Sequence, residues 1–357
     1  MKARSVPTAA LVTIGVLTVA SCGSTSDPGG NSSGDYAKDG SFTTIVNTDP
    51  GNLHPLITNL TATQAINSYT NDSLLAIDPK TRAAGSYLAE KWSENGTSLN
   101  FTLKKGITCE DGTTFTAQTA ANNINWVVDT TNGSPWLGAS VPETAVATAD
   151  GDELTIKTTE PAPFLLERIG ALKMACQAAL DDPASVRGSS NGTGLFKITE
   201  VVANDHVTLE RRDGYNWGPN GETTSDTLGV PKTVTIKVVT DAATTANLVL
   251  TGTVNAAPVA GADIERVEAS GLESMTSNTL SGQFIFNHNA ALPTKDEAVR
   301  TALVQAIDLD DYTDINTGGK GSRATALAVV DPRACDFDSV TGVVPKFDMA
   351  AAKKTLA

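Results

Sequence analysis

The segment 99–126 does most to limit the folds open to this chain. Every second residue from Leu99 to Leu103 is apolar, which predicts a strand with one buried face. Asp111-Gly112 predicts a tight turn, because glycine adopts a positive φ without steric cost. A helix pattern follows, and Thr116 is placed to cap it. A strand, a turn and a helix in close succession favour a domain that mixes α and β elements.

Similar patterns recur along the chain. Residues 42–46 form a short apolar strand candidate, and the alternation of apolar residues at 234–238 predicts another strand. The apolar residues of 298–307 fall on one helical face, with Thr294 or Asp296 as the cap. These patterns place the chain in the α/β or α+β classes.

Composition narrows the class of function. The chain has 357 residues, enough for two or three domains, and 40% of them are hydrophobic. Its formal net charge is −14, which argues against binding to a nucleic-acid backbone. Only three histidines and four cysteines are present, so few metal ligands are available. We expect no metal site, no cofactor and no nucleic-acid partner.

The first residues indicate export from the cell. Lys2 and Arg4 precede an apolar run at 9–20, which is typical of a signal peptide and too short to span a membrane. Ser21-Cys22 ends this run and resembles the bacterial lipobox, in which the cysteine becomes the lipid anchor. The alternative is an ordinary secretory signal with an incidental cysteine. We expect a lipoprotein signal peptide at 1–21 and attachment to the extracytoplasmic face of the cell membrane through Cys22.

The segment 22–40 is predicted to be a flexible linker. Half of the residues from 23 to 40 are Gly or Ser, so the segment cannot bury enough apolar area to order itself. No later stretch is long and apolar enough to cross a membrane.

The remaining cysteines bear on stability. In an oxidising compartment Cys109 and Cys176 are candidates for a disulfide, and the alternative is two separate buried thiols. Cys335 then has no obvious partner.

Catalytic motifs are missing from the sequence. It contains no Gly-x-Ser-x-Gly, Ser-x-x-Lys, Cys-x-x-Cys or His-Glu-x-x-His motif, and its histidines are far apart. These absences favour a binding protein over an enzyme.

Five segments together resemble one known family. Leu88-Ala-Glu-Lys-Trp92 resembles the Leu-Ala-Glu-Ser-Trp of family 5 solute-binding proteins of ABC transporters, the oligopeptide, dipeptide and nickel-binding type. Gly192-Thr-Gly-Leu-Phe-Lys-Ile198 resembles the Gly-Thr-Gly-Pro-Tyr strand of that family, and its two glycines let the strand re-enter without side-chain clash. Residues 211–217 belong with this segment, and the other three segments are 52–55 with 73–78, 99–117, and 284–287 with 299–308. Together with the lipobox, they make the chain resemble an actinobacterial-style lipoprotein of this family.

The resemblance implies an α/β, bilobed periplasmic-binding-protein-like fold of type II, in the three-domain cluster. Lobe I would comprise 41–80 and 191–280, a satellite domain 81–190, and the start of lobe II 281–357. The ligand would lie in the cleft between the lobes. Carried over by position, the ligand-binding residues are Asn59, Leu60 and Thr61 of the first loop, Trp136 of the satellite domain, and Gln283 and Phe284 of the first strand of lobe II.

The sequence departs from the family pattern at its end. Residues 347–357 begin a helix, with Asp348 as its cap, and family members continue considerably further. We therefore expect a truncated C-terminal part and an incomplete second lobe. The expected function is a monomeric lipoprotein that captures peptides or similar small solutes for a permease in the membrane. The alternatives are an interaction or scaffold lipoprotein of the same fold and, less favoured, an extracytoplasmic hydrolase.

Overall fold

A computed structural model describes residues 36–37, 39–275, 280, 282–326 and 337–357. The predicted signal peptide, the lipid-anchor residue Cys22, most of the linker and Cys335 lie outside these residues. None of the helices described is long and apolar enough to cross a membrane.

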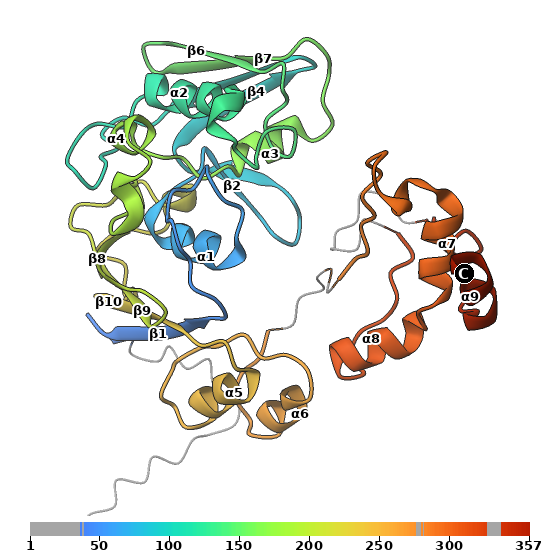
Figure 1. The fold of residues 1–357 in the computed structure, drawn as a ribbon. Helices are drawn as coiled ribbons and strands as arrows, with labels where there is room; N and C mark the ends of the chain where they lie inside the picture. The colour runs from blue at the N-terminus through green and yellow to red at the C-terminus, as the bar shows by residue number, and fades with distance from the viewer. Residues whose placement is uncertain (1–35, 38, 276–279, 281, 327–336) are drawn as a thin grey trace, which may run out of the picture. The chain divides into compact units, whose positions relative to one another are not determined.

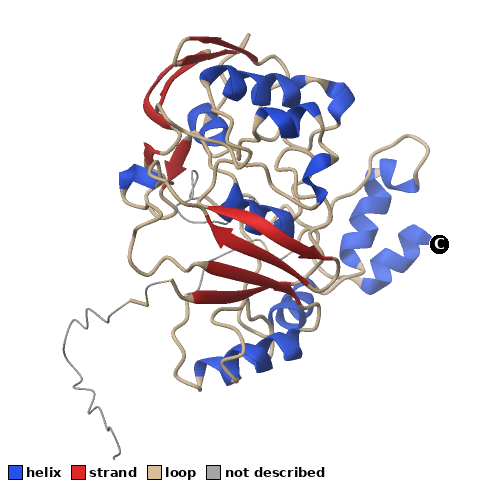
Figure 2. Cartoon of the chain, turned by 90° about the vertical axis from the view of Figure 1, so that its left-hand side faces the viewer, coloured by secondary structure: helices blue, strands red, loops and turns tan. Residues whose placement is uncertain are grey.

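A first sheet joins segments that lie far apart in the sequence. It contains β1 (Ser41–Val46), β10 (Thr233–Val238), β9 (His206–Arg211) and β8 (Phe196–Val202), in that order (Figure 2). β1 runs parallel to β10, and the other pairs are antiparallel. The apolar residues of the sheet pack with Ala62 and Ile66 of α1 (Thr61–Thr70) in one hydrophobic cluster. The strands predicted at 42–46 and 234–238 are confirmed.

A second sheet contains the strand predicted from the alternation of Leu99 to Leu103. Its strands are β4 (Ala89–Asn95), β5 (Ser98–Leu103), β7 (Glu153–Lys157) and β6 (Val146–Asp150), all antiparallel. Leu99, Phe101 and Leu103 are buried, as the alternation predicts. Helix α2 (Ala117–Val128) packs on this sheet, and the Thr116 hydroxyl accepts a hydrogen bond from the Thr119 N–H (3.3 Å).

Short elements connect the two sheets. The hairpin of β2 (Leu75–Ile77) and β3 (Ala84–Ser86) precedes β4, and the helices α3 (Leu165–Gly170) and α4 (Gln177–Asp181) follow β7 (Figure 1). Single 3-10 turns lie at Thr130–Asn132, Ser185–Arg187, Pro219–Gly221 and Pro293–Lys295.

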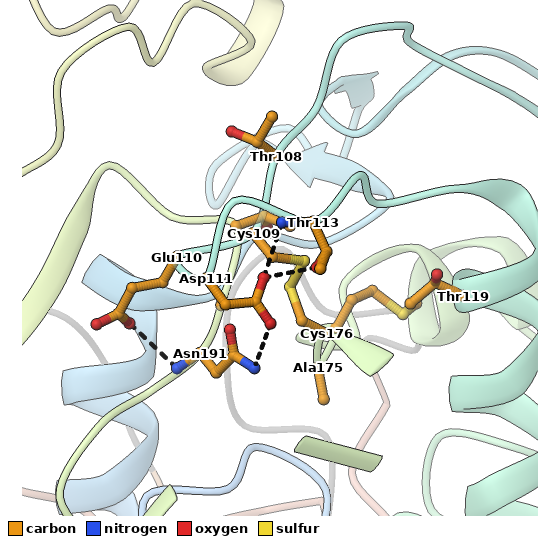
Figure 3. Close-up of a disulfide and its surroundings, with 12 residues drawn as sticks. Thr108, Cys109, Glu110, Asp111, Thr113, Thr119, Ala175, Cys176 and Asn191 are labelled. Atoms are coloured by element: carbon orange, nitrogen blue, oxygen red, sulfur yellow. Dashed lines mark hydrogen bonds between the residues drawn. A yellow bond between two sulfur atoms is a disulfide. The ribbon is translucent and has the colours of Figure 1, made fainter. Parts of the chain in front are cut away.

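Cys109 and Cys176, the candidate pair, form a disulfide in the structure. Figure 3 shows the loop around Cys109, where the Asn191 side chain donates to the Asp111 carboxylate (3.2 Å) and the Asn191 N–H donates to Glu110 (3.1 Å). The disulfide joins the loop after β5 to the start of α4.

The later helices are α5 (Ala242–Leu250), α6 (Asp263–Glu268), α7 (Glu297–Gln305), α8 (Leu309–Thr317) and α9 (Met349–Leu356). Of the two predicted caps of α7, the structure uses Asp296, whose carboxylate accepts from the Ala298 N–H (2.8 Å). Asp348 caps α9 as expected. The lobe and satellite boundaries remain predictions.

The strand predicted at Gln283 and Phe284 is wrong. The residues from 282 to 289 adopt no strand, and Phe284 lies half exposed, with its ring centroid 5.5 Å from that of Tyr312. A strand needs a neighbour to pair its backbone N–H and C=O groups, and no described segment pairs with these residues.

Candidate functional site

An open groove of about 210 Å³ lies beside Trp136. We call it the Trp136 groove. Four separate segments supply its lining: α1, the turn between β2 and β3, the turn at 136–140, and α3 with the residues that follow it. The lining residues are Gln64, Arg82, Trp136, Ser140, Glu167, Arg168, Ala171, Leu172 and Lys173.

Hydrogen bonds hold Trp136 against the loop that precedes α1. The Trp136 indole N–H donates to the carbonyl of Pro55 (2.9 Å), and the Ser134 hydroxyl donates to the carbonyl of Leu56 (2.7 Å). The Gln64 amide also donates to Pro55 (3.2 Å) and to Thr58 (2.9 Å). The structure thus joins the predicted aromatic residue to Pro55, a few residues before the predicted ligand residues 59–61 and 81 positions away in the sequence.

Positive charge gathers in this groove. Arg82, Arg168 and Lys173 line it together with a single carboxylate, that of Glu167. Arg168 is fixed on the wall because its guanidinium donates to the carbonyls of Gly138 (2.6 Å) and Ala139 (2.8 Å). Arg82 is exposed and sits in the β2–β3 turn. In a chain of net charge −14, a local excess of cations favours an anionic group.

A buried carboxylate lies behind Lys173. Asp72 is 1% exposed, and it accepts hydrogen bonds from the Tyr87 hydroxyl (2.6 Å) and the Trp217 indole N–H (3.0 Å). Burial raises the pKa of the Asp72 carboxyl, while these bonds and the charge of Lys173 oppose that rise. Burial lowers the pKa of the Lys173 ammonium, and the negative charge of Asp72 opposes that shift.

His54 has a structural role in the same region. Its ring is fully buried and stacks on Trp126, with 5.2 Å between the ring centroids. Nδ1 accepts from the Leu56 N–H (3.1 Å), so Nε2 carries the proton and donates to the Ala179 carbonyl (3.1 Å). Burial lowers the pKa of His54 to about 4, and the ring is therefore neutral at pH 7.

The other predicted ligand residues do not line this groove. Asn59, Leu60 and Thr61 are exposed at the start of α1, one turn before Gln64. Phe284 instead lines an apolar pocket of about 480 Å³ with residues of α7 and Leu309. Among the residues that the structure describes, no three His, Cys, Asp or Glu side chains are placed to hold a metal ion.

Sequence reasoning missed Gln64, Arg82, Arg168 and Lys173. One signal was available for Lys173, because it is a single charged residue within the apolar run 171–176. A lysine in such a run is expected to have a specific partner or to reach solvent with its ammonium group. Arg82 lies in a polar turn, and Arg168 follows Glu167 in a helix whose Leu165 and Ile169 are buried, so neither carries a comparable signal.

Comparison with known proteins identifies the family. The model of the bacterial extracellular solute-binding proteins, family 5, matches residues 84–357. The chain belongs to this family. The predicted resemblance is therefore confirmed, and the relatives are named as binding proteins rather than enzymes, in agreement with the expectation.

Curated relatives include the glutathione-binding protein GsiB of Shigella dysenteriae serotype 1, which is 26% identical over 338 residues. That match covers 91% of this solute-binding protein and 61% of the relative. GsiB of Escherichia coli K12 is also 26% identical, with 77% and 53% covered. This chain thus spans less than two thirds of the length of the relatives that it matches.

Solved structures show the fold. A substrate-binding protein of Microbacterium hydrocarbonoxydans in complex with 4-hydroxybenzoate hydrazide is 25% identical, with a TM-score of 0.68 over 89% of this chain and 66% of that one. The oligopeptide-binding protein AppA of Bacillus subtilis, in complex with a nonapeptide, is 20% identical, with a TM-score of 0.70 over 89% and 63%. This solute-binding protein therefore has the mixed α/β fold of the type II, bilobed periplasmic binding proteins.

Proposed function

We propose that this chain is an extracytoplasmic lipoprotein that captures peptides or similar small solutes and delivers them to an ABC permease. Family membership supports the general role in solute binding. The observation that carries the proposal is the Trp136 groove, in which an aromatic ring is hydrogen-bonded to the loop that precedes α1.

The groove suits the end of a small solute rather than a reaction. Trp136 offers a flat apolar surface, and Gln64 and the cations supply polar contacts around it. Asn59, Leu60 and Thr61 are exposed, and in this proposal they contact an extended peptide, which such sites bind through main-chain hydrogen bonds. In this proposal Gln283 and Phe284 contact the solute from the second lobe.

The lipid on Cys22 keeps the proposed receptor at the membrane, and the linker 23–40 holds the folded part off the lipid surface. In this proposal the receptor acts as a monomer.

The test is a thermal melt of the purified chain with and without pooled dipeptides, tripeptides and glutathione. A ligand that binds only the folded state stabilises it by RT ln(1 + [L]/Kd), about 2.7 kcal/mol at one hundred times Kd. We expect the midpoint to rise with at least one pool. The variant Trp136→Ala should show a smaller rise, while Trp92→Ala, on the edge strand β4, serves as the aromatic control.

A cooperative melt that no pool shifts would contradict peptide capture and favour the scaffold alternative. A shift that is the same in wild type and Trp136→Ala would support solute binding but place the site elsewhere than in the groove.

A further inference from the structure

We propose that Lys173 and Arg82 form a subsite in the Trp136 groove that takes a carboxylate group of the solute. The inference rests on the proposed function for the identity of the solute, but the subsite itself can be tested without it. Its basis is the placement of Lys173, which differs from that of an ordinary surface lysine.

The backbone of Lys173 is fixed on both sides. Lys173 forms a β-bridge with Ser73, and the N–H of the next residue, Met174, donates to the carbonyl of Asp72 (2.9 Å). Leu172 and Met174 are buried, so the chain cannot shift here without exposing apolar surface. The half-buried side chain of Lys173 is thereby held at the groove.

The ammonium group of Lys173 has hydrogen-bond donors to spare. Within the part of the chain that the structure describes, no carboxylate lies within 4 Å of its Nζ atom and no hydrogen bond from it is found. Its nearest identified partner is the face of the Tyr87 ring, whose centroid lies 5.8 Å away. An ammonium group that is partly removed from water gains more from an anion than a fully exposed one does.

Asp72 compensates part of the charge of Lys173 without occupying its donors. The carboxylate is engaged with Tyr87 and Trp217, whose bonds hold it in place. The groove is lined by three cations and the carboxylate of Glu167, and Asp72 lies behind it. The formal charges of these five side chains sum to +1. A single net positive charge next to an aromatic surface fits one carboxylate better than a dianion such as phosphate.

The first experiment titrates the full chain with succinate monomethyl ester, a monoanion, and with inorganic phosphate at constant ionic strength. The readout is the Trp136 indole ¹H–¹⁵N signal, assigned with Trp136→Phe. We expect the monoanion to shift this signal in saturable fashion in wild type, and Lys173→Met to bind it at least tenfold more weakly. Lys91→Met, an exposed lysine on β4, is the matched control and should behave as wild type.

Two more variants guard against a folding defect in Lys173→Met. Lys173→Arg keeps the positive charge and should retain measurable binding, whereas Arg82→Gln, at an exposed turn position, should weaken binding about threefold. Tighter binding of phosphate than of the monoanion, or equal binding by wild type and both Arg82→Gln and Lys173→Met, overturns the proposal.

The second experiment compares dipeptides that carry a free carboxyl terminus with their C-terminal amides. We expect the amides to bind at least tenfold more weakly to wild type, and the difference to vanish in Lys173→Met. If no peptide binds but the monoanion binds in a Lys173-dependent way, the subsite stands and the proposed solute class is wrong. If acid and amide bind alike, in wild type and Lys173→Met, peptide capture stands and the subsite is overturned.

Discussion

Single residues near the Trp136 groove show how burial sets charge. Asp72 and His54 are both shielded from water, yet only Asp72 lies near an ammonium group and several hydrogen-bond donors. His54 has one donor and one acceptor as partners, which suit the neutral ring. The two residues thus share their burial but differ in what surrounds them.

His54 predicts a loss of stability in mild acid. Its pKa is about 4 in the folded chain against 6.5 for an ordinary histidine. Because the folded pKa is the lower one, the unfolded chain takes up a proton first as the pH falls below 6.5. The stability that the neutral ring supplies is therefore present above pH 6.5 and is lost progressively down to about pH 4. The loss is on the order of 3 kcal/mol.

Urea unfolding of wild type and His54→Gln at pH 7.5 and pH 4.5 measures this effect. The difference in unfolding free energy between the two proteins should narrow at pH 4.5, because carboxylate titrations are common to both. A gap that stays constant with pH would contradict the prediction. His206→Gln is the control, since neighbouring carboxylates raise the pKa of that partly exposed histidine and its contribution has the opposite sign.

At the scale of elements, two glycines let the chain that enters β8 pass close to the end of α1. Gly194 donates its N–H to the carbonyl of Thr70 (2.9 Å), the last residue of α1. A Cβ atom at Gly192 would lie 2.0 Å from the Thr70 carbonyl oxygen, and one at Gly194 would lie 2.5 Å from that of Tyr69. The expectation that these glycines avoid a side-chain clash is confirmed.

Gly194→Ala should therefore destabilise the chain by about 2–4 kcal/mol, because the clash is with backbone that cannot rotate away. Gly188→Ala is the matched control, since a Cβ atom there meets nothing within 4 Å and the backbone does not require a positive φ. Thermal and urea melts of both variants provide the measurement. A Gly194→Ala protein as stable as Gly188→Ala would show that the contact between Gly194 and the end of α1 leaves room for a Cβ atom, and would contradict the prediction.

At the scale of the whole molecule, distant segments must meet before the first sheet exists. β1 lies near the start of the described chain and pairs with β10, with Phe42 opposite Val234. The strands of the second sheet lie between β1 and β10 in the sequence. The disulfide between Cys109 and Cys176 cross-links two positions 67 residues apart within this intervening segment. In the chain-entropy model, closing a loop of that length stabilises the folded state by about 4 kcal/mol, because it restricts the unfolded chain.

The proposed anchor gives a prediction for the whole chain. When the chain is produced with its leader in a bacterial host, Triton X-114 extraction should carry it into the detergent phase, because a diacylglycerol on Cys22 supplies the apolar area that the linker lacks. Cys22→Ala should move it to the aqueous phase. Wild type found in the aqueous phase, with its leader removed, would support the ordinary secretory signal instead.

The sequence alone determined the family, the mixed α/β class and several local elements. The alternation from Leu99 to Leu103 and the Thr116 cap depend on neighbouring residues, so short-range rules predict them. Only the tertiary structure decided the groove, where Trp136, Arg82 and Lys173 come from segments that sequence spacing does not relate. It also decided against a strand at Phe284, because a strand forms only where another backbone is present to pair with it.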